Sequence, residues 1–293
     1  MSTIYHAAAK INLMLHVTDR YDNGYHHLQS IFVFASCGDE VSVSPDSELK
    51  LMVGGPFAHQ LPADSSQNLV IKAIEWLGSY QGVTLTGAIH LRKNLPIASG
   101  IGGGSSDAAA AIAAFLPTDI TPQNRLEIIK ASGVLGADVP ICLAYQLGLG
   151  TAFWLDGSGT EGDIKTLTLP SSLEIVLVNP DESVLTSEIF KSLKRPYSDP
   201  LETPEAFANK EALLEFLSKQ RNDFEVPLQT LVPSTNDVLE AISSSRHNLL
   251  ARVSGSGATC FGLYADKTDA ATAAQKIQER YPDWWVSAAS LVV

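Results

Sequence analysis

Near the N-terminus, hydrophobic and small polar positions follow a repeat of two, which is typical of a β-strand. Over residues 8–15 this repeat separates two faces, one carrying Ala8, Lys10, Asn12 and Met14 and the other Ala9, Ile11, Leu13 and Leu15. The second face is wholly hydrophobic and predicts contact with a core. The first face leaves room for a ligand beside the lysine ammonium. Taken alone, however, a lysine whose stem covers apolar surface at a sheet edge is the simpler interpretation.

The rest of the chain alternates irregularly between strand-like and helix-like segments. Strands are predicted at residues 4–17, 40–44, 49–53, 84–92, 174–179, 252–253, 259–263 and 285–292. Helices are predicted at residues 68–80, 105–116, 122–132, 187–193, 204–219, 235–245 and 268–280. The alternation in the second half predicts β-α-β units. A turn rich in Gly and Asp at residues 156–162 places a boundary between two domains near residue 160.

Length and composition narrow the class of protein. The 293 residues are 45% hydrophobic and 18% charged, as expected for a packed protein of two domains. The longest apolar run, residues 108–116, is too short to cross a bilayer, and the N-terminus lacks a signal-peptide pattern, so we expect no membrane association. A net charge of −12 disfavours nucleic acid as a partner. Three widely spaced cysteines favour the reducing cytoplasm over a disulfide framework or a zinc cluster.

A glycine-rich segment directly before an alanine-rich helix is the most informative part of the chain. Residues 96–108 read PIASGIGGGSSDA, with four glycines in five positions at Gly100, Gly102, Gly103 and Gly104. Glycines let an anion approach the unpaired N–H groups and the positive dipole of a helix start. The segment lacks the Gly-Lys-Ser/Thr of a P-loop and fits the dinucleotide fingerprint poorly. It therefore favours phosphate binding over a plain serine-capped turn, and we interpret Asp107 as helix-stabilising.

Two further segments gain meaning beside this loop. Asp138 lies in Leu-Gly-Ala-Asp-Val-Pro and would ordinarily be a turn residue. Near a lysine and a phosphate site, however, a carboxylate can accept the proton of an alcohol during phosphoryl transfer. Residues 252–259, RVSGSGAT, form either a plain hairpin or a loop of backbone donors for a substrate. Taken alone, this last segment favours the hairpin.

In this order, the segments resemble the superfamily of galactokinase, homoserine kinase, mevalonate kinase and phosphomevalonate kinase. The matching motifs are AKINL at residues 9–13, GYHHL at 24–28, PIASGIGGGSSDAA at 96–109, GADVP at 136–140, NDFE at 222–225 and GSGATCF at 255–261. The resemblance covers nearly the whole chain. Each motif alone is moderately specific, whereas the ordered set is highly specific and extends to the members that act on a cytidyl-diphosphate alcohol.

The resemblance implies a two-domain α+β fold with an active site in the cleft between the domains. Residues 1–160 would form an ATP-binding and catalytic domain, and residues 161–293 a substrate-binding domain. The implied reaction moves the ATP γ-phosphate to the 2-hydroxyl of a cytidyl-diphosphate methylerythritol, on the non-mevalonate route to isoprenoid precursors. Mg²⁺ would arrive with ATP rather than in a metal site of the protein. The chain would act as a monomer or a homodimer.

The resemblance also assigns roles to residues. Asp138 would be the general base and Lys10 its electrostatic partner. ATP binding is assigned to Asn68, Lys93, Pro96, Gly100, Ile101, Gly102, Gly103, Gly104, Ser105 and Ser106. Substrate binding is assigned to Asn12, Tyr25, His26, Asp138, Thr186, Phe190, Gly255 and Gly257. Tyr25 and Phe190 would stack on the cytosine while His26 reads its edge, although a half-buried strand and a helix core explain the same three residues.

Three other functions are compatible with parts of the sequence. Another small-alcohol kinase is disfavoured by Tyr25 and His26, because mevalonate and homoserine offer no base to stack. A non-catalytic nucleotide-binding regulator is disfavoured by the presence of Lys10 and Asp138, and a dinucleotide-dependent oxidoreductase by the glycine spacing. The sequence departs from the family at Ala98 and Ser99, where glycine is common, which predicts a stiffer loop. Residues 155–162 are also longer and less regular than the usual turn.

Overall fold

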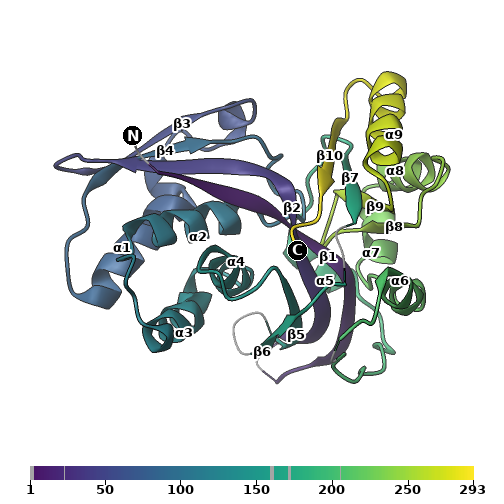
Figure 1. Cartoon of the computed structure of the whole chain (residues 1–293), viewed down its shortest axis with the longest axis horizontal. Helices are drawn as coiled ribbons and strands as arrows, with labels where there is room; N and C mark the ends of the chain where they lie inside the picture. The colour runs from purple at the N-terminus through teal and green to yellow at the C-terminus, as the bar shows by residue number, and fades with distance from the viewer. Residues whose placement is uncertain (1–2, 23, 159–161, 171–172, 205) are drawn as a thin grey trace.

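The computed structural model describes residues 3–22, 24–158, 162–170, 173–204 and 206–293, which fold into two adjoining halves, each with a β-sheet and helices (Figure 1). The first half contains β1 (Ile4–Arg20), β2 (His26–Ser44), β3 (Leu49–Gly54), α1 (Leu69–Gln81), β4 (Gly87–Arg92), α2 (Gly103–Phe115), α3 (Pro122–Ala131), α4 (Val139–Gln146), β5 (Ala152–Gly157) and β6 (Gly162–Leu167). The second half contains β7 (Glu174–Asn179), α5 (Thr186–Ser192), α6 (Lys210–Ser218), α7 (Glu225–Leu231), α8 (Ser234–Ser243), β8 (Leu250–Val253), β9 (Cys260–Tyr264), α9 (Lys267–Arg280) and β10 (Trp285–Ser290).

The first sheet is built around two long strands. Its order is β3-β4-β2-β5-β6, and β1 pairs antiparallel with β2 along most of its length. The pairing of β3 with β4 is parallel, and the other pairings are antiparallel. Figure 1 shows that β1 and β2 run from one half of the molecule into the other, with α1, α2 and α4 gathered on one side of them. The two strands therefore connect the halves structurally.

The second sheet has the order β10-β7-β9-β8, and all three of its pairings are antiparallel. The predicted β-α-β arrangement occurs in this half, as β9-α9-β10, and there the two parallel strands are separated by another strand. The strand between them is β7, which pairs with both. Periodicity along the chain identifies elements, whereas the pairing of strands depends on partners far away in the sequence.

A bulge in β1 changes which residues share a face. The pairing with β2 shifts between Ala8 and Lys10 and again between Asn12 and Met14. As a result, Met14 packs in the core with Ile11 and Leu13, whereas Leu15 lines a cavity together with Lys10 and Asn12. The predicted alternation thus holds up to Leu13 and is wrong for Met14 and Leu15, because the extra residue of a bulge reverses the side to which later residues point.

The hydrophobic core is continuous between the two halves. One cluster of buried residues joins Ile11 and Val33 of the long strands to Leu177 of β7, Leu213 of α6 and Phe261 of β9. Because β5 and β6 pair across residue 160, the first sheet continues to Leu167. The division into domains at residue 160 stays a prediction, and residues 159–161 of the turn read at residues 156–162 lie outside the described residues.

Several elements differ in extent from the sequence prediction. Strand β2 has 19 residues, although only residues 40–44 are predicted as strand, and α4 and α7 are not predicted. The middle of β2 and most of α4 are buried, so neither shows the alternation of a half-exposed element. Helix α6 begins at Lys210 rather than at residue 204.

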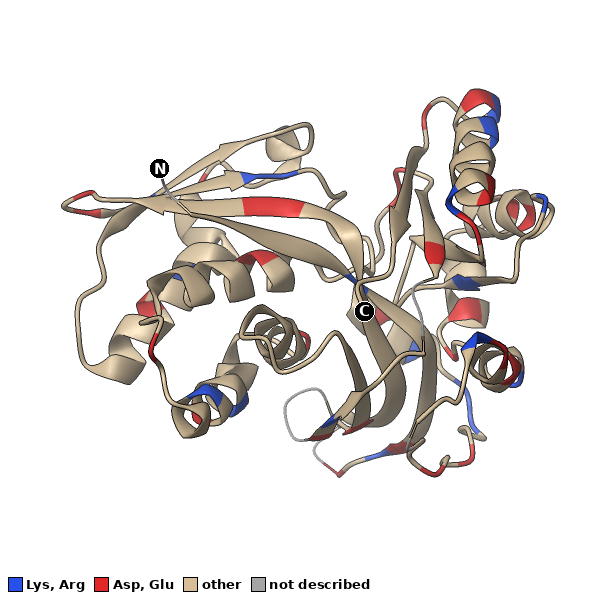
Figure 2. Ribbon diagram, viewed as in Figure 1, with Lys and Arg blue, Asp and Glu red and all other residues tan. Residues whose placement is uncertain are grey.

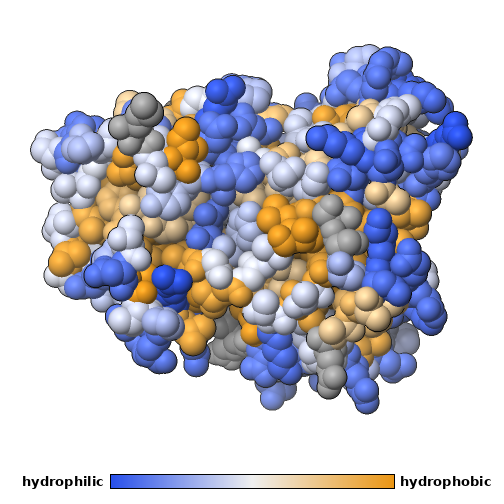
Figure 3. Space-filling model, in the orientation of Figure 1, coloured by the Kyte–Doolittle hydropathy of each residue, from blue (hydrophilic) through white to orange (hydrophobic). Residues whose placement is uncertain are grey.

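The surface carries charges of both signs. Figure 2 shows acidic and basic residues interspersed over both halves, and Figure 3 shows hydrophilic residues gathered over α9 with hydrophobic areas nearer the middle of the face. In the part of the chain that the structure describes, no helix has the length and apolar character that a bilayer crossing requires.

Candidate active site

A cavity of about 530 Å³ opens between the two halves. The first half lines it from β1, β2, the glycine loop and the start of α4, and the second half from the segment before α5, from α5 and from two loops. The predicted residues that it brings together are Lys10, Asn12, Gly100, Gly102, Gly103, Gly104, Ser105, Asp138, Thr186, Phe190 and Gly255. The cavity therefore occupies the cleft in which the resemblance places an active site.

Lys10 and Asp138 form an ion pair at the wall of this cavity. The Lys10 Nζ lies 3.0 Å from Asp138 Oδ2 and 3.0 Å from Asn12 Oδ1. The side chain of Lys10 is only 4% exposed, whereas that of Asp138 is 36% exposed. The carboxylate thus faces the open space while the ammonium supports it from the protein side. This is the arrangement of a proton acceptor beside a fixed positive charge.

The glycine loop holds Lys10 in place. The Lys10 N–H donates to the Ile101 carbonyl at 2.9 Å. Gly102 has a φ of +64°, and a Cβ at this position would lie 2.8 Å from Lys10 Cε. A side chain here would require both a strained backbone and displacement of the lysine, so glycine permits the close approach.

Asn12 connects the lysine to three other parts of the site. Its Nδ2 donates to Ser30 Oγ at 2.8 Å, and its backbone N–H donates to Ser254 Oγ at 3.2 Å. Ser254 Oγ in turn donates to the Gly100 carbonyl. The buried amide of Asn12 is therefore engaged in orienting Lys10, and its predicted contact with substrate stays a prediction.

The start of α2 has the features of an anion site. The N-cap residue is Gly102, and no side chain among the described residues caps the helix. A Cβ at Gly104 would meet no described atom within 4 Å, which means that this backbone position opens onto the cavity. Unpaired N–H groups and the positive end of the helix dipole are therefore available to a phosphate.

Residues 222–225 hold the glycine-containing loop at residues 252–259 against β1. Asn222 Nδ2 donates to the carbonyls of Val253 and Gly255 at 2.9 and 2.8 Å. Asp223 accepts from the Val17 N–H at 2.7 Å, and its backbone N–H donates to the Leu15 carbonyl. Two hydrogen bonds from the Asn222 amide thus connect this loop to a segment that pairs with β1.

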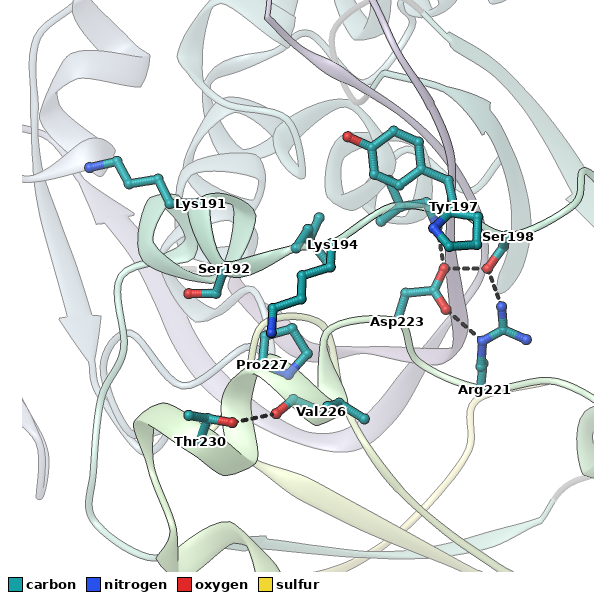
Figure 4. Close-up of a pocket in the computed structure, with 13 residues that line it drawn as sticks. Lys191, Ser192, Lys194, Tyr197, Ser198, Arg221, Asp223, Val226, Pro227 and Thr230 are labelled. Atoms are coloured by element: carbon teal, nitrogen blue, oxygen red, sulfur yellow. Dashed lines mark hydrogen bonds and ion pairs between the residues drawn. The ribbon is translucent and has the colours of Figure 1, made fainter.

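A second cavity of about 600 Å³ lies on the other side of this segment. Figure 4 shows Asp223 at its wall, bonded to Arg221 and Ser198. Because Asp223 also accepts from β1, these contacts stabilise the position of residues 222–225 from outside the first cavity.

Aromatic rings gather at the α5 end of the first cavity. The rings of His26 and Phe190 are stacked with centroids 4.7 Å apart, and Phe224 meets Phe190 edge-on at 4.9 Å. Burial lowers the pKa of His26, with the charge of Arg20 acting in the same direction, so its imidazole is held neutral at pH 7. Tyr25 is 56% exposed, and neither it nor His26 lines the cavity itself.

The other predicted site residues lie outside the cavity lining. These are Asn68, Lys93, Pro96, Ile101, Ser106 and Gly257, together with Tyr25 and His26. The side chain of Asn68 caps α1, and the Ser106 hydroxyl donates to the Ala8 carbonyl at 2.8 Å. Lys93 is buried between two carboxylates, so its side chain is not directed into the cavity as an ATP-binding role would require.

The structure places further residues at the site that the sequence analysis did not single out. Ser254 and Ser256 belong to the glycine motif at residues 252–259, and Phe224 belongs to the NDFE motif, so both motifs contained a signal. Thr186 Oγ1 lies 2.9 Å from Ser256 Oγ, which joins α5 to this loop. Phe32, by contrast, is an apolar strand residue without a chemical signature, and only the fold brings it to the cavity.

Comparison with known proteins connects this geometry to a family. The family models for the GHMP kinases N terminal domain and the GHMP kinases C terminal region match residues 68–145 and 205–283. A 4-diphosphocytidyl-2-C-methyl-D-erythritol kinase of Paramagnetospirillum magneticum is 43% identical over 290 residues, which cover 98% of this chain and 97% of the relative. The protein of the same name from Cereibacter sphaeroides is 43% identical over 288 residues, or 98% of each chain.

The comparison with solved structures points to the same family as the comparison of sequences. A crystal structure of a 4-(cytidine 5'-diphospho)-2C-methyl-D-erythritol kinase matches with a TM-score of 0.73 and 26% identity, covering 99% of this chain and 100% of the other. Homoserine kinase from Cytophaga hutchinsonii shares the fold, with a TM-score of 0.66 at 18% identity over 99% of this chain and 94% of that one. On its sequence and its fold together, the chain belongs to the 4-diphosphocytidyl-2-C-methyl-D-erythritol kinase family of the GHMP kinases.

Proposed function

We propose that the chain transfers the γ-phosphate of ATP to the 2-hydroxyl of 4-(cytidine 5'-diphospho)-2-C-methyl-D-erythritol, in the non-mevalonate route to isoprenoid precursors. The observation that carries the proposal is the ion pair of Lys10 with Asp138, 3.0 Å long, beside the open start of α2 in one cavity. Membership of the kinase family, at 43% identity over nearly the whole chain, supports the choice of substrate.

The described residues suggest how the transfer proceeds. Asp138 accepts the proton of the attacking hydroxyl, while Lys10 holds this carboxylate in place and stabilises charge on the transferred group. Gly102 to Ser105 hold the phosphates at the N-terminus of α2. Mg²⁺ enters as the ATP complex, since phosphate oxygens are ligands that it prefers, and it supplies charge neutralisation.

The aromatic end of the cavity suits the cytidine. Phe190 lines the cavity and is backed by His26 and Phe224. A base that stacks on such a ring gains ~1–3 kcal/mol, and we assign a second stacking surface to the exposed ring of Tyr25. We assign the cytosine to this end and the ATP phosphates to the glycine loop.

The free thiols agree with a location in the reducing cytoplasm. Cys37, Cys142 and Cys260 form no disulfide in the structure. Burial raises the pKa of Cys142 to about 12, which keeps this thiol protonated and unreactive beneath the site.

The first experiment measures ADP release with Mg-ATP and four separate acceptors: the cytidyl-diphosphate methylerythritol, mevalonate, homoserine and galactose. We expect turnover with the cytidyl compound alone. Turnover with another alcohol would retain the mechanism and reject the cytidine site. ATP binding without any turnover would indicate a nucleotide-binding regulator instead.

The variant Asp138→Asn tests the proton acceptor, because it keeps the size of the side chain and removes its basicity. We expect kcat to fall by ~10²–10⁴, with ATP binding and thermal unfolding retained. The matched control is Asp119→Asn, which changes an exposed aspartate outside the cavity and should leave kcat unchanged. Near-normal turnover of Asp138→Asn would remove this residue from the mechanism.

A further inference from the structure

A cluster of three buried charged residues lies directly behind the glycine loop. The Lys93 ammonium bonds to Asp39 Oδ2 and, at 2.9 Å, to Asp107 Oδ2. All three side chains are at most 4% exposed. Burial of ions without compensation is strongly unfavourable, so a cluster of this kind is maintained only by close pairing.

The cluster joins three elements that lead to the phosphate site. Asp39 belongs to β2, Lys93 follows β4, and Asp107 belongs to α2. Asp39 Oδ1 also accepts from the backbone N–H groups of Asn94 and Leu95, at 2.5 and 2.9 Å. One carboxylate therefore fixes both the ammonium and the turn from which the glycine loop begins.

The ammonium occupies the space beside Gly103 that a side chain at this position would need. A Cβ at Gly103 would lie 3.2 Å from Lys93 Nζ and 3.6 Å from Asp39 Oδ2. Gly103 lines the cavity, and so do its neighbours Gly102 and Gly104. A shift of the ammonium would consequently move the backbone that faces the ATP phosphates, although Lys93 itself does not line the cavity.

The two aspartates contribute unequally to balancing the positive charge of Lys93. Asp39 accepts three hydrogen bonds, whereas Asp107 Oδ1 has no partner among the described residues. Burial raises the pKa of Asp107 well above its usual range, and the Lys93 charge only partly offsets this effect. Asp39 is therefore the partner that balances the lysine charge, and Asp107 is the weaker one.

We propose that Lys93 is a positioning residue, which together with Asp39 fixes Gly103 and the start of α2 for the ATP phosphates without touching ATP through its side chain. This inference rests on the proposed function, because it concerns the loop to which we assign those phosphates. It replaces the role of ATP ligand that the sequence resemblance assigns to this side chain.

The test compares the same chemical change on the two sides of the ammonium. We expect Asp39→Asn to weaken ATP and ADP binding by ~10²-fold, because an amide donor would face the ammonium and move the loop. Asp107→Asn should weaken it by less than about threefold, since an amide oxygen can still accept from Lys93. Adenosine, which lacks phosphates, should bind both variants as it binds the unmodified chain. Binding is measured by calorimetry without the alcohol, so that an error in the proposed substrate cannot change the result.

A double-mutant cycle then separates positioning from direct contact. If Lys93 and Asp39 act as one unit, Lys93→Met should weaken ATP binding strongly in the parent chain and only slightly in Asp39→Asn. Equal losses in both backgrounds, or normal ATP binding by Asp39→Asn, would overturn the proposal and make Lys93 a ligand.

Two further measurements exclude a purely structural role. Each variant is checked by thermal unfolding, and KM for ATP is compared with KM for the cytidyl substrate. We expect KM for ATP to rise selectively, whereas a structural role would lower the unfolding temperature and leave KM for ATP unchanged, which would also overturn the proposal. The control Lys219→Met removes an exposed lysine paired with Glu215 on the surface and should change neither constant.

Discussion

At the scale of single residues, Ala98 combines a glycine-like backbone with a side chain at the cavity. Its φ is +49°, in the left-handed region that costs a residue with a Cβ about 1 kcal/mol or more. It stands where the family resemblance leads us to expect glycine. The strain is maintained by neighbouring contacts, including the bond from the Thr259 N–H to the Ser99 carbonyl at 3.1 Å.

Ala98→Gly should therefore leave the free energy of unfolding unchanged or raise it by up to about 1 kcal/mol, because released strain offsets the entropy of glycine. The control Ala271→Gly, at an exposed position in α9, should lower it by about 1 kcal/mol. Urea unfolding of both variants measures the difference. Equal destabilisation of the two would show that Ala98 carries no strain.

His16 predicts a pH dependence of stability. It is buried, and neither ring nitrogen has a hydrogen-bond partner among the described residues. Burial lowers the pKa of His16 from 6.5, with Asp223 acting against this effect and Arg221 and Arg252 acting with it. Below pH 6.5 the unfolded chain therefore binds more protons than the folded chain, and stability present above pH 6.5 is lost as the pH falls.

The variant His16→Gln should flatten the fall in unfolding free energy as the pH decreases below 6.5, whereas His59→Gln, at an exposed histidine, should not. Urea titrations at several pH values give the comparison. A profile of His16→Gln parallel to that of the parent chain would contradict the assignment.

At the scale of elements, the start of α2 is a place where a substitution can weaken ligand binding without lowering the free energy of unfolding. The side-chain position of Gly104 meets no described atom, and it faces the space to which we assign the phosphates. The proposed site therefore depends on an empty volume that a single methyl group would occupy.

For Gly104→Ala we expect the free energy of unfolding to be retained or raised by up to about 1 kcal/mol, since alanine is the better helix former. ATP affinity should fall by at least about tenfold, because the methyl group blocks the backbone N–H groups. Calorimetric titration with ATP, alongside urea unfolding, measures both. Normal ATP affinity would place the phosphates elsewhere.

Element by element, the sequence predicted segments with a visible pattern. The alanine-rich residues of α2 and the apolar residues 174–179 of β7 are examples. It did not predict α4, whose residues from Val139 to Ala144 are all buried, because a uniformly apolar segment has no periodicity.

At the scale of the whole molecule, Arg252 connects the two halves. This buried residue of β8 donates to the carbonyls of Leu13, Leu217 and Gln220 at 2.7, 2.9 and 2.7 Å. Burial lowers the pKa of Arg252 to about 10, while Glu225 acts against this effect, so the guanidinium remains charged at pH 7.

Arg252→Met should lower the free energy of unfolding by about 3 kcal/mol, because three carbonyls lose their donor and two of these hydrogen bonds are buried. Arg246→Met, at an exposed position, should change it by no more than about 0.5 kcal/mol. Urea unfolding measures both values. A loss for Arg252→Met as small as that of the control would show that the halves do not depend on this contact.

The sequence by itself determined the chemical groups of the site and their order along the chain: the lysine of β1, the glycine loop and Asp138. Local rules sufficed for these, because turns, helix starts and alternation depend on neighbours in sequence. The tertiary structure decided that β7 divides the last β-α-β unit, that a bulge exchanges Met14 and Leu15, and that Lys93 lies behind the loop. Each of these depends on contacts between residues far apart in the chain, and no local pattern encodes them.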